Sequence, residues 1–161
     1  MNYFFSDLVI LSIHDLLPHE EINESKVLSI IGEIKGHQYL FAPVLVDKRS
    51  KIIIDGHHRY NALKNMGYKS VPCIECNYLS KKIVALKEGP NGRELDKKYV
   101  ISLAKNGQLL PKKYTFHVYK NGDAYDHLSK IIRPISLDLS KIWETFICFI
   151  NLLFRLIIFC L

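Results

Sequence analysis

Short apolar runs alternate with polar turns along the first part of the chain, which predicts strands and helices in alternation. Residues 8–13 form the first apolar run and are expected to form a strand, and a polar turn follows at 15–21. Two residues of helix-capping type, Asn23 and Ser25, then precede apolar positions at helical spacing, and Gly36 is expected to end this helix. The polar turn therefore lies between two regular elements.

A strand pair, a second helix and another strand are predicted next. The apolar runs 43–46 and 52–54 are separated by a polar turn, as in neighbouring strands. A helix follows the segment 55–59, carries apolar residues on one side and stops at Gly67. Residues 70–76 are expected to form the next strand.

Loop and turn residues divide the second half of the chain. A loop is expected at 88–92, and a helix over 96–105 is expected to end at the pair Asn106 and Gly107. A strand is expected to begin near Tyr114, with a turn following at Asn121 and Gly122. No internal repeat is visible.

The composition is that of one ordinary globular domain. The chain has 161 residues, of which 48% are hydrophobic and 24% are charged, and its formal net charge is +6. This composition excludes disorder over most of the length, because such a chain can bury a sizeable core. The basic residues are dispersed, so the charge permits an anionic partner without identifying one and favours no nucleic-acid-binding tail.

Cysteine spacing favours neither a disulfide scaffold nor a metal site. Cys73 and Cys76 have the two-residue gap of half a zinc site, while Cys148 and Cys160 lie in an apolar tail and offer no matching pair. On the strand expected at 70–76, residues three apart point to opposite faces. A shared metal or redox role is therefore the less favoured interpretation.

The two ends of the chain differ in character. Residues 1–7 lack a basic region and a cleavage site, so no signal peptide is expected. We therefore expect a cytoplasmic location. Residues 146–161 are apolar apart from Asn151 and Arg155. A helix of that length would be about 24 Å long, against a hydrocarbon core of roughly 30 Å. A peripheral membrane anchor, a helix that covers a partner and a marginal spanning segment all stay open.

The most informative stretch is Asp-Gly-His-His-Arg, which follows a β-branched strand and opens a helix. The helix start has unpaired N–H groups and a favourable dipole for anions, and Gly56 lets an anion approach the backbone. His57, His58 and Arg59 add donors, so the pattern indicates a phosphate site. Asp55 is a candidate ligand for Mg²⁺ or for a substrate group. A plain surface turn is the alternative interpretation.

Residues 55–63 resemble the nucleotide-binding signature of the ParB/sulfiredoxin superfamily. Within it, the likeness is greatest to the free L-serine kinases, whose Pro-His-Glu segment matches 18–20 and whose C-terminal Pro-Lys element matches 110–117. The resemblance covers roughly 8–78 in good order and 94–140 more loosely. It implies a small α/β (α+β) domain over 1–140, with a mixed sheet and flanking helices. The tail 141–161 has no counterpart in the kinase, and its apolar sequence itself predicts a hydrophobic C-terminal helix.

The resemblance also implies site residues and a reaction. Glu20 would be the general base, and Asp55 would lie near the substrate and Mg²⁺. The nucleotide phosphates would bind at Gly56, His57, His58 and Arg59, and the substrate at Thr115 and His117 with Lys112 beside them. The implied reaction transfers phosphate from ADP or ATP to free L-serine to give O-phospho-L-serine. A carboxylate that takes the hydroxyl proton suits this chemistry, as do fixed donors that neutralise phosphate charge.

Departures from the family patterns keep other functions open. His57 stands where sulfiredoxin has its catalytic Cys, which disfavours that reaction. The kinase carries a Trp after the strand that matches 70–76, where this chain has residues 86–88, and Phe116 replaces an Arg of the kinase. The sequence therefore indicates the identity of the acceptor less strongly than it indicates phosphate binding. The alternatives are a ParB-like CTP-binding regulator or DNA-associated protein without kinase activity, and a degenerate member that 146–161 tethers to a membrane or a protein.

Overall fold

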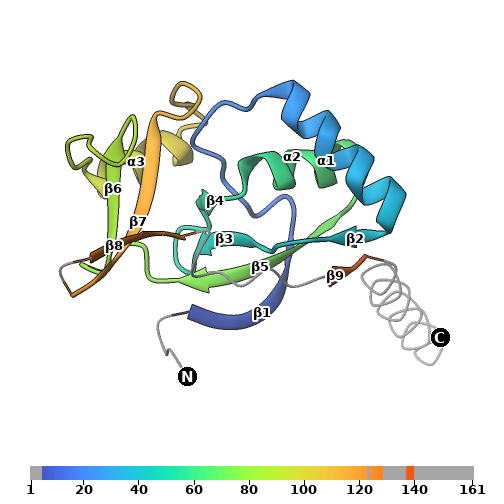
Figure 1. Cartoon of the computed structure of the whole chain (residues 1–161), viewed down its shortest axis with the longest axis horizontal. Coiled ribbons are helices and arrows are strands. Elements are labelled where there is room, and N and C mark those ends of the chain that lie inside the picture. The colour runs from blue at the N-terminus through green and yellow to red at the C-terminus, as the bar shows by residue number, and fades with distance from the viewer. Residues whose placement is uncertain (1–4, 123, 129–136, 140–161) are drawn as a thin grey trace, which may run out of the picture.

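The computed structural model describes residues 5–122, 124–128 and 137–139, which form three sheets and three helices (Figure 1). In chain order the elements are β1 Phe5–Ser12, α1 Glu24–His37, β2 Tyr39–Leu40, β3 Val44–Asp47, β4 Ile53–Asp55, α2 His57–Asn65, β5 Ser70–Cys76, β6 Ile83–Lys87, α3 Lys97–Lys105, β7 Thr115–Asn121, β8 Ala124–His127 and β9 Leu137–Asp138. This arrangement confirms the expected mixed α/β class.

The largest sheet has four strands in the order β1-β5-β3-β4. β5 pairs antiparallel with β1 and parallel with β3, and β3 pairs antiparallel with β4. Helices α1 and α2 lie together on one side of this sheet (Figure 1). Their apolar residues Val27, Ile34 and Leu63 pack with Val44 and Val46 of β3 in one buried cluster. Burial of this face stabilises the fold and holds the start of α2 beside the end of β4.

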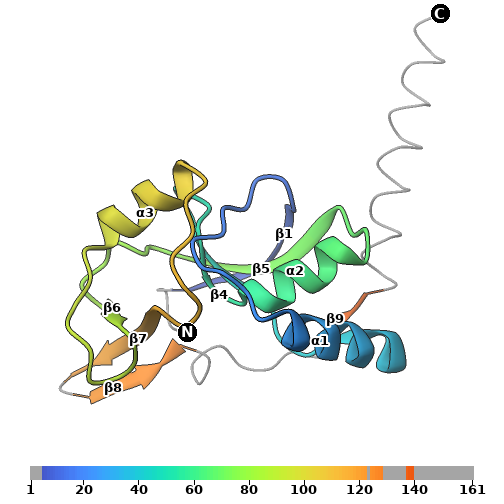
Figure 2. The same ribbon diagram turned by 90° about the horizontal axis from the view of Figure 1, so that it is seen from above.

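A second sheet, β6-β7-β8, is antiparallel throughout and lies beside the first, with α3 packed nearby (Figures 1 and 2). Ile83 of β6, Tyr119 of β7 and Ala104 of α3 share a buried cluster with Ile54 of β4 and with Ile52, which directly precedes that strand. The apolar residues around β4 thus join the two sheets. The short pair β2 and β9 forms the third sheet.

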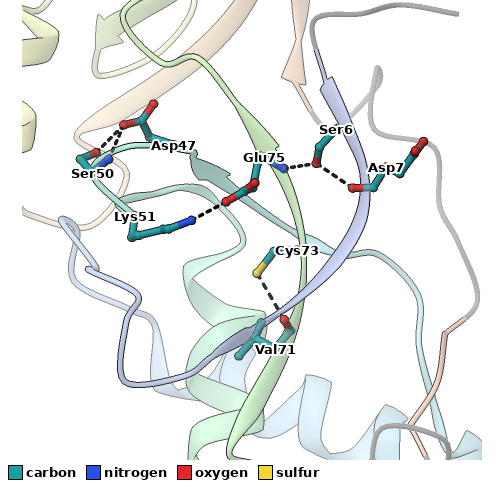
Figure 3. A network of polar contacts seen from close by, with 8 residues as sticks. All are labelled: Ser6, Asp7, Asp47, Ser50, Lys51, Val71, Cys73 and Glu75. Atoms are coloured by element: carbon teal, nitrogen blue, oxygen red, sulfur yellow. Dashed lines mark hydrogen bonds and ion pairs between the residues drawn. The ribbon is translucent and has the colours of Figure 1, made fainter. Parts of the chain in front are cut away.

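Side-chain hydrogen bonds fix the turn between β3 and β4. Asp47 Oδ2 accepts hydrogen bonds from the backbone N–H and the hydroxyl of Ser50, both at 2.7 Å, and Asp47 Oδ1 accepts one from the backbone N–H of Tyr78 at 2.9 Å. Lys51 forms an ion pair with Glu75 of β5, so the turn is also tied to the neighbouring strand (Figure 3). The polar turn predicted between these strands is confirmed.

Most predicted elements are confirmed, but two boundaries differ and four strands were missed. β1 begins at Phe5, three residues before the predicted start, and no element was predicted where β2, β6, β8 and β9 lie. Gly36 does not end α1, which continues to His37 and finishes where Gln38 adopts a left-handed conformation with φ 60. The Gln38 N–H still donates to the Ile34 carbonyl, and a glycine within a helix costs only about 1 kcal/mol, so Gly36 is tolerated. Residues 83–87, for which no element was predicted, form β6.

The two cysteines of β5 do not form a joint site. Cys73 packs in the cluster that contains α1 and α2, and Cys76 packs in the cluster between the sheets. Both thiols are free and buried, and burial raises the pKa of each to about 12. The predicted opposite orientation is confirmed, and inert thiols of this kind act as core residues.

The apolar tail 146–161 and the domain boundary expected at 140 lie outside the described residues. Among the helices within 5–122, 124–128 and 137–139, none has the length and apolar character needed to cross a bilayer.

Candidate active site

Backbone pairing places the predicted catalytic turn between two distant parts of the chain. The Leu17 carbonyl accepts a hydrogen bond from the N–H of Ile53 in β4 at 2.9 Å. Two residues on, the His19 carbonyl accepts from the N–H of Leu110 at 2.8 Å, and the N–H of Glu21 donates to the Leu110 carbonyl at 2.9 Å. The loop from β1 to α1 thus runs between β4 and the segment before β7 (Figures 1 and 2), and Glu20 is held at their junction.

A cavity of about 600 Å³ lies at this junction. Its walls come from the β1–α1 turn, α1, the β4–α2 junction, the loop after β6, and β7 with β8. All the predicted site residues except Lys112 line it, namely Glu20, Asp55, Gly56, His57, His58, Arg59, Thr115 and His117. Segments almost a hundred residues apart in the sequence therefore meet around one cavity.

The start of α2 leaves its backbone amides to an outside acceptor. Gly56 is the residue before the helix, has φ +98, and carries no side chain that could accept from the first amides. By contrast, the starts of α1 and α3 are capped by Asn23 and Asp96, whose side chains accept from Ser25 N–H and Lys98 N–H. The first turn of α2 also contains no acidic residue. A helix start of this kind binds anions.

Arg59 lies against this helix start and pairs with Asp55. Its Nη2 donates to Asp55 Oδ2 at 2.9 Å and to the Pro43 carbonyl at 3.3 Å. A Cβ at Gly56 would come within 2.9 Å of the same Nη2, so the guanidinium occupies the space that a side chain would take. The buried Nε of Arg59 has no hydrogen-bond partner among the described residues. The guanidinium therefore keeps donor capacity next to the free amides.

Glu20 is held in one orientation by three donors from a single segment. Its Oε2 accepts from the Thr115 hydroxyl at 2.6 Å and the Thr115 N–H at 2.9 Å, and its Oε1 accepts from the Lys113 N–H at 2.8 Å. A carboxylate oxygen can accept about two hydrogen bonds. Oε1 thus retains a lone pair with which it can accept a hydrogen bond from a further donor in the cavity.

Three neutral histidines form the buried wall behind the cavity. The His19 ring lies edge-on to His57 and His117, with ring centroids 4.5 Å and 5.6 Å apart. Burial lowers the pKa of His19 to about 4 and lowers the pKa values of His57 and His117 well below the usual range. His117 Nε2 is 2.8 Å from the hydroxyl of buried Tyr78.

His58 differs from these three because it is only partly buried. Its Nε2 accepts a hydrogen bond from the backbone N–H of Asn23 at 3.0 Å, which connects α2 to the start of α1. Desolvation is the main cause that lowers its pKa, with nearby Lys26 acting in the same direction. His58 therefore faces the cavity mainly as a neutral side chain at pH 7.

The structure also adds residues that the sequence did not single out. Lys113 rather than Lys112 lines the cavity, together with Lys26 of α1 and the loop residues Glu88 and Gly89. No sequence pattern marks Lys26 or Glu88, because their presence at the cavity depends on how α1 and β6 pack. His19 precedes Glu20 in the Pro-His-Glu segment, and that adjacency was the available signal for it.

The donor set suits a metal ion that is brought by phosphates rather than one held by the protein alone. Within the part of the chain that the structure describes, no three His, Cys, Asp or Glu side chains are grouped as metal ligands. Mg²⁺ commonly uses only one or two carboxylates together with substrate phosphates. Asp55 meets that smaller requirement, although it is paired with Arg59 here.

Sequence relatives include both kinases and a ParB-like protein. No family model matches the chain. The ATP-dependent L-serine kinases of Desulfurococcus mucosus and Staphylothermus marinus are 30% and 33% identical to it, over 50% and 47% of this chain and 33% and 31% of those proteins. A ParB-like protein of Sulfolobus acidocaldarius is 39% identical over 42% of this chain and 34% of its own length. The matches thus span about a third of each relative.

Solved structures share the fold more completely. Free serine kinase in complex with AMP has a TM-score of 0.68 at 15% identity, over 84% of this chain and 93% of that one. A C-terminally truncated SbnI from Staphylococcus aureus has a TM-score of 0.57 at 13% identity, over 88% and 95% of the two chains. The relatives and this shared fold confirm the resemblance to the ParB/sulfiredoxin superfamily and, within it, to the free serine kinases.

Proposed function

We propose that the chain is a small-molecule kinase that transfers phosphate from a nucleotide to free L-serine. The observation that carries this proposal is that Glu20 and the open start of α2 line the same cavity. A base and an anion site that share one cavity are what phosphoryl transfer to a hydroxyl requires. The relatives named L-serine kinases and the fold of free serine kinase support the same reaction.

The nucleotide phosphates bind at the start of α2. The amides after Gly56 and the guanidinium of Arg59 supply donors, and the helix dipole adds favourable potential. Because Arg59 is paired with Asp55, phosphate binding and release of the Asp55 carboxylate are expected to accompany each other. Asp55 would be the residue that holds Mg²⁺, and the ion would supply charge neutralisation.

Glu20 acts as the general base toward the acceptor hydroxyl. When the serine oxygen attacks the terminal phosphorus, its proton passes to Glu20 Oε1, which keeps a free lone pair. The bond from phosphorus to the leaving nucleotide oxygen breaks, and the shorter nucleotide departs. His117 and Lys113, which line the same cavity, are the candidate contacts for the acceptor. Lys112 is a weaker candidate, because Lys113 lines the cavity and Lys112 does not.

A product assay tests this proposal. The protein is incubated with Mg²⁺, one nucleotide at a time from ADP, ATP and CTP, and a panel of free amino acids, and the products are followed by ³¹P NMR. O-phospho-L-serine with ADP or ATP is the expected product. Phosphorylation of a different amino acid would retain the kinase and correct the acceptor, whereas no phosphorylated amino acid with any donor would reject the kinase.

A ParB-like regulator is the second candidate. The relative named a ParB-like protein favours it, since it is 39% identical over 71 residues. A regulator of this kind would bind CTP in preference to adenine nucleotides or bind DNA with a steep salt dependence, without transferring phosphate. Nucleotide affinities measured by calorimetry therefore separate the two candidates.

A further inference from the structure

A continuous chain of hydrogen bonds runs from the buried histidines to Glu20. His19 Nε2 lies 3.0 Å from Thr115 Oγ1, and Thr115 Oγ1 lies 2.6 Å from Glu20 Oε2. His19 is fully buried, with 0% of its surface exposed, and its ring is wedged edge-on between His57 and His117. His19 thus holds the Thr115 hydroxyl in place, and Thr115 holds the Glu20 carboxylate in place.

The direction of the protons in this chain follows from the groups involved. A carboxylate can only accept, so the hydroxyl proton of Thr115 points to Glu20. The Thr115 oxygen must then accept from His19, which places a proton on Nε2 of that ring. His19 is neutral at pH 7 because burial lowers its pKa to about 4, so this is the single proton of the ring.

We propose that Thr115, held in turn by His19, is a positioning residue that fixes the Glu20 carboxylate and keeps its Oε1 available to the acceptor hydroxyl. This role rests on the proposed kinase function. It differs from a direct substrate contact, because the hydroxyl proton of Thr115 is already donated to Glu20. Misplacing a catalytic group by about 1 Å can lower the rate about a hundredfold without changing substrate affinity.

Two variants of Thr115 separate positioning from substrate contact. Thr115→Val replaces the hydroxyl by a methyl group of similar size and leaves the Thr115 N–H bond to Glu20 possible. We expect kcat to fall by about a hundredfold with the KM values for serine and nucleotide within about threefold. Thr115→Ser restores the hydroxyl and should recover kcat to within about fivefold. Thermal melting of both variants checks that the fold is kept.

A spectroscopic measurement tests the hydrogen-bond chain without reference to activity. Long-range ¹H–¹⁵N spectra of the histidine-labelled protein at pH 7.5 should show His19 neutral with its proton on Nε2, and that signal should move in Thr115→Val. A proton on Nδ1, or an unchanged kcat in Thr115→Val, would overturn the inference. So would a rise in the KM for serine at constant kcat, which would make Thr115 a substrate contact.

The two proposals can fail separately. If the wild-type protein phosphorylates no amino acid with any nucleotide, the kinase function fails, and the histidine spectra alone decide whether the chain from His19 to Glu20 exists. If the wild-type protein is active while Thr115→Val loses no activity, the kinase function stands and the positioning role fails.

Discussion

Gly56 is the residue at which backbone conformation and ligand binding are most directly connected. Its φ of +98 lies in a region that residues with a Cβ rarely adopt, and the Nη2 atom of Arg59 fills the space where a Cβ would stand. Both the shape of the turn and the place of the guanidinium therefore depend on the missing side chain.

Substituting this glycine should weaken both stability and nucleotide binding. For Gly56→Ala we expect the free energy of unfolding to fall by about 1–2 kcal/mol, because the left-handed conformation is strained for alanine. The displaced guanidinium should also weaken nucleotide binding by about tenfold, which corresponds to about 1.4 kcal/mol. Urea denaturation and calorimetric titration with ADP and ATP measure the two effects.

Gly67 provides the matched control for this substitution. Its φ is +84, and a Cβ there would meet nothing within 4 Å. Gly67→Ala should therefore cost similar stability and leave nucleotide affinity unchanged. Equal nucleotide affinity in the two variants would contradict the proposal that Arg59 needs the space beside Gly56, where a Cβ would stand, in order to bind the nucleotide.

At the scale of elements, the start of α1 supports the cavity through α2. The Asn23 side chain caps α1 by accepting from the Ser25 N–H at 3.0 Å, and the Asn23 N–H donates to His58 Nε2 at 3.0 Å. Lys26 and Ser29 of the same helix line the cavity. Fraying of the first turn of α1 would thus loosen one wall of the site.

Removing the Asn23 cap of α1 should lower nucleotide affinity as well as the stability of the fold. Asn23→Ala should lower the free energy of unfolding by about 1 kcal/mol, the usual cost of a lost N-cap, and should weaken nucleotide binding. The control is Asp96→Ala, which removes the cap of α3, where Asp96 Oδ1 accepts from Lys98 N–H at 2.8 Å. It should cost similar stability without an effect on binding, and a parallel loss of affinity in both would refute the specific role of α1.

Local sequence patterns predicted the elements wherever the signal was itself local. The cap at Asn23, the glycine stop at Gly67 and the polar turn after β3 depend on neighbouring residues, and all three are confirmed. β6 was missed because its pairing with β7 links residues 83–87 to the distant residues 115–119. The end of α1 was misplaced because tertiary packing outweighs the weak helix-breaking effect of Gly36.

The site could be predicted only as separate pieces. Among the residues that line the cavity, the Pro-His-Glu segment supplied Glu20 and the motif 55–59 supplied all five of its members. Their meeting depends on the backbone pairing of 17–21 with β4 and with Leu110, which no local pattern encodes. The contact between Glu20 and Thr115 depends on the same long-range pairing.

For the whole molecule, the buried histidines make stability sensitive to acid. Burial is the main cause that lowers the pKa values of His19, His57 and His117 and keeps these rings neutral in the folded state. Arg59 adds a smaller effect on His57, and Lys97 adds one on His117. In the unfolded chain these rings bind protons below a pH of about 6.5. Stability contributed by the neutral rings is therefore complete above that pH and is lost as the pH falls toward 4.

Urea denaturation at pH 7.5 and pH 5 measures this loss. A folded pKa of about 4 for His19 predicts that this ring alone removes about 2 kcal/mol of the free energy of unfolding between the two values. His57 and His117 should add to the loss. A free energy of unfolding that stays constant from pH 7.5 to 5 would contradict the buried neutral state of the three rings.

The most direct test of the account compares Glu20→Gln with Glu21→Gln. Glu20 accepts three hydrogen bonds inside the cavity, whereas the neighbouring Glu21 is exposed. O-phospho-L-serine formation, followed by ³¹P NMR, should continue in wild type and Glu21→Gln and fall by at least about a hundredfold in Glu20→Gln, with nucleotide affinity within a few fold. Undiminished product formation by Glu20→Gln would contradict the account.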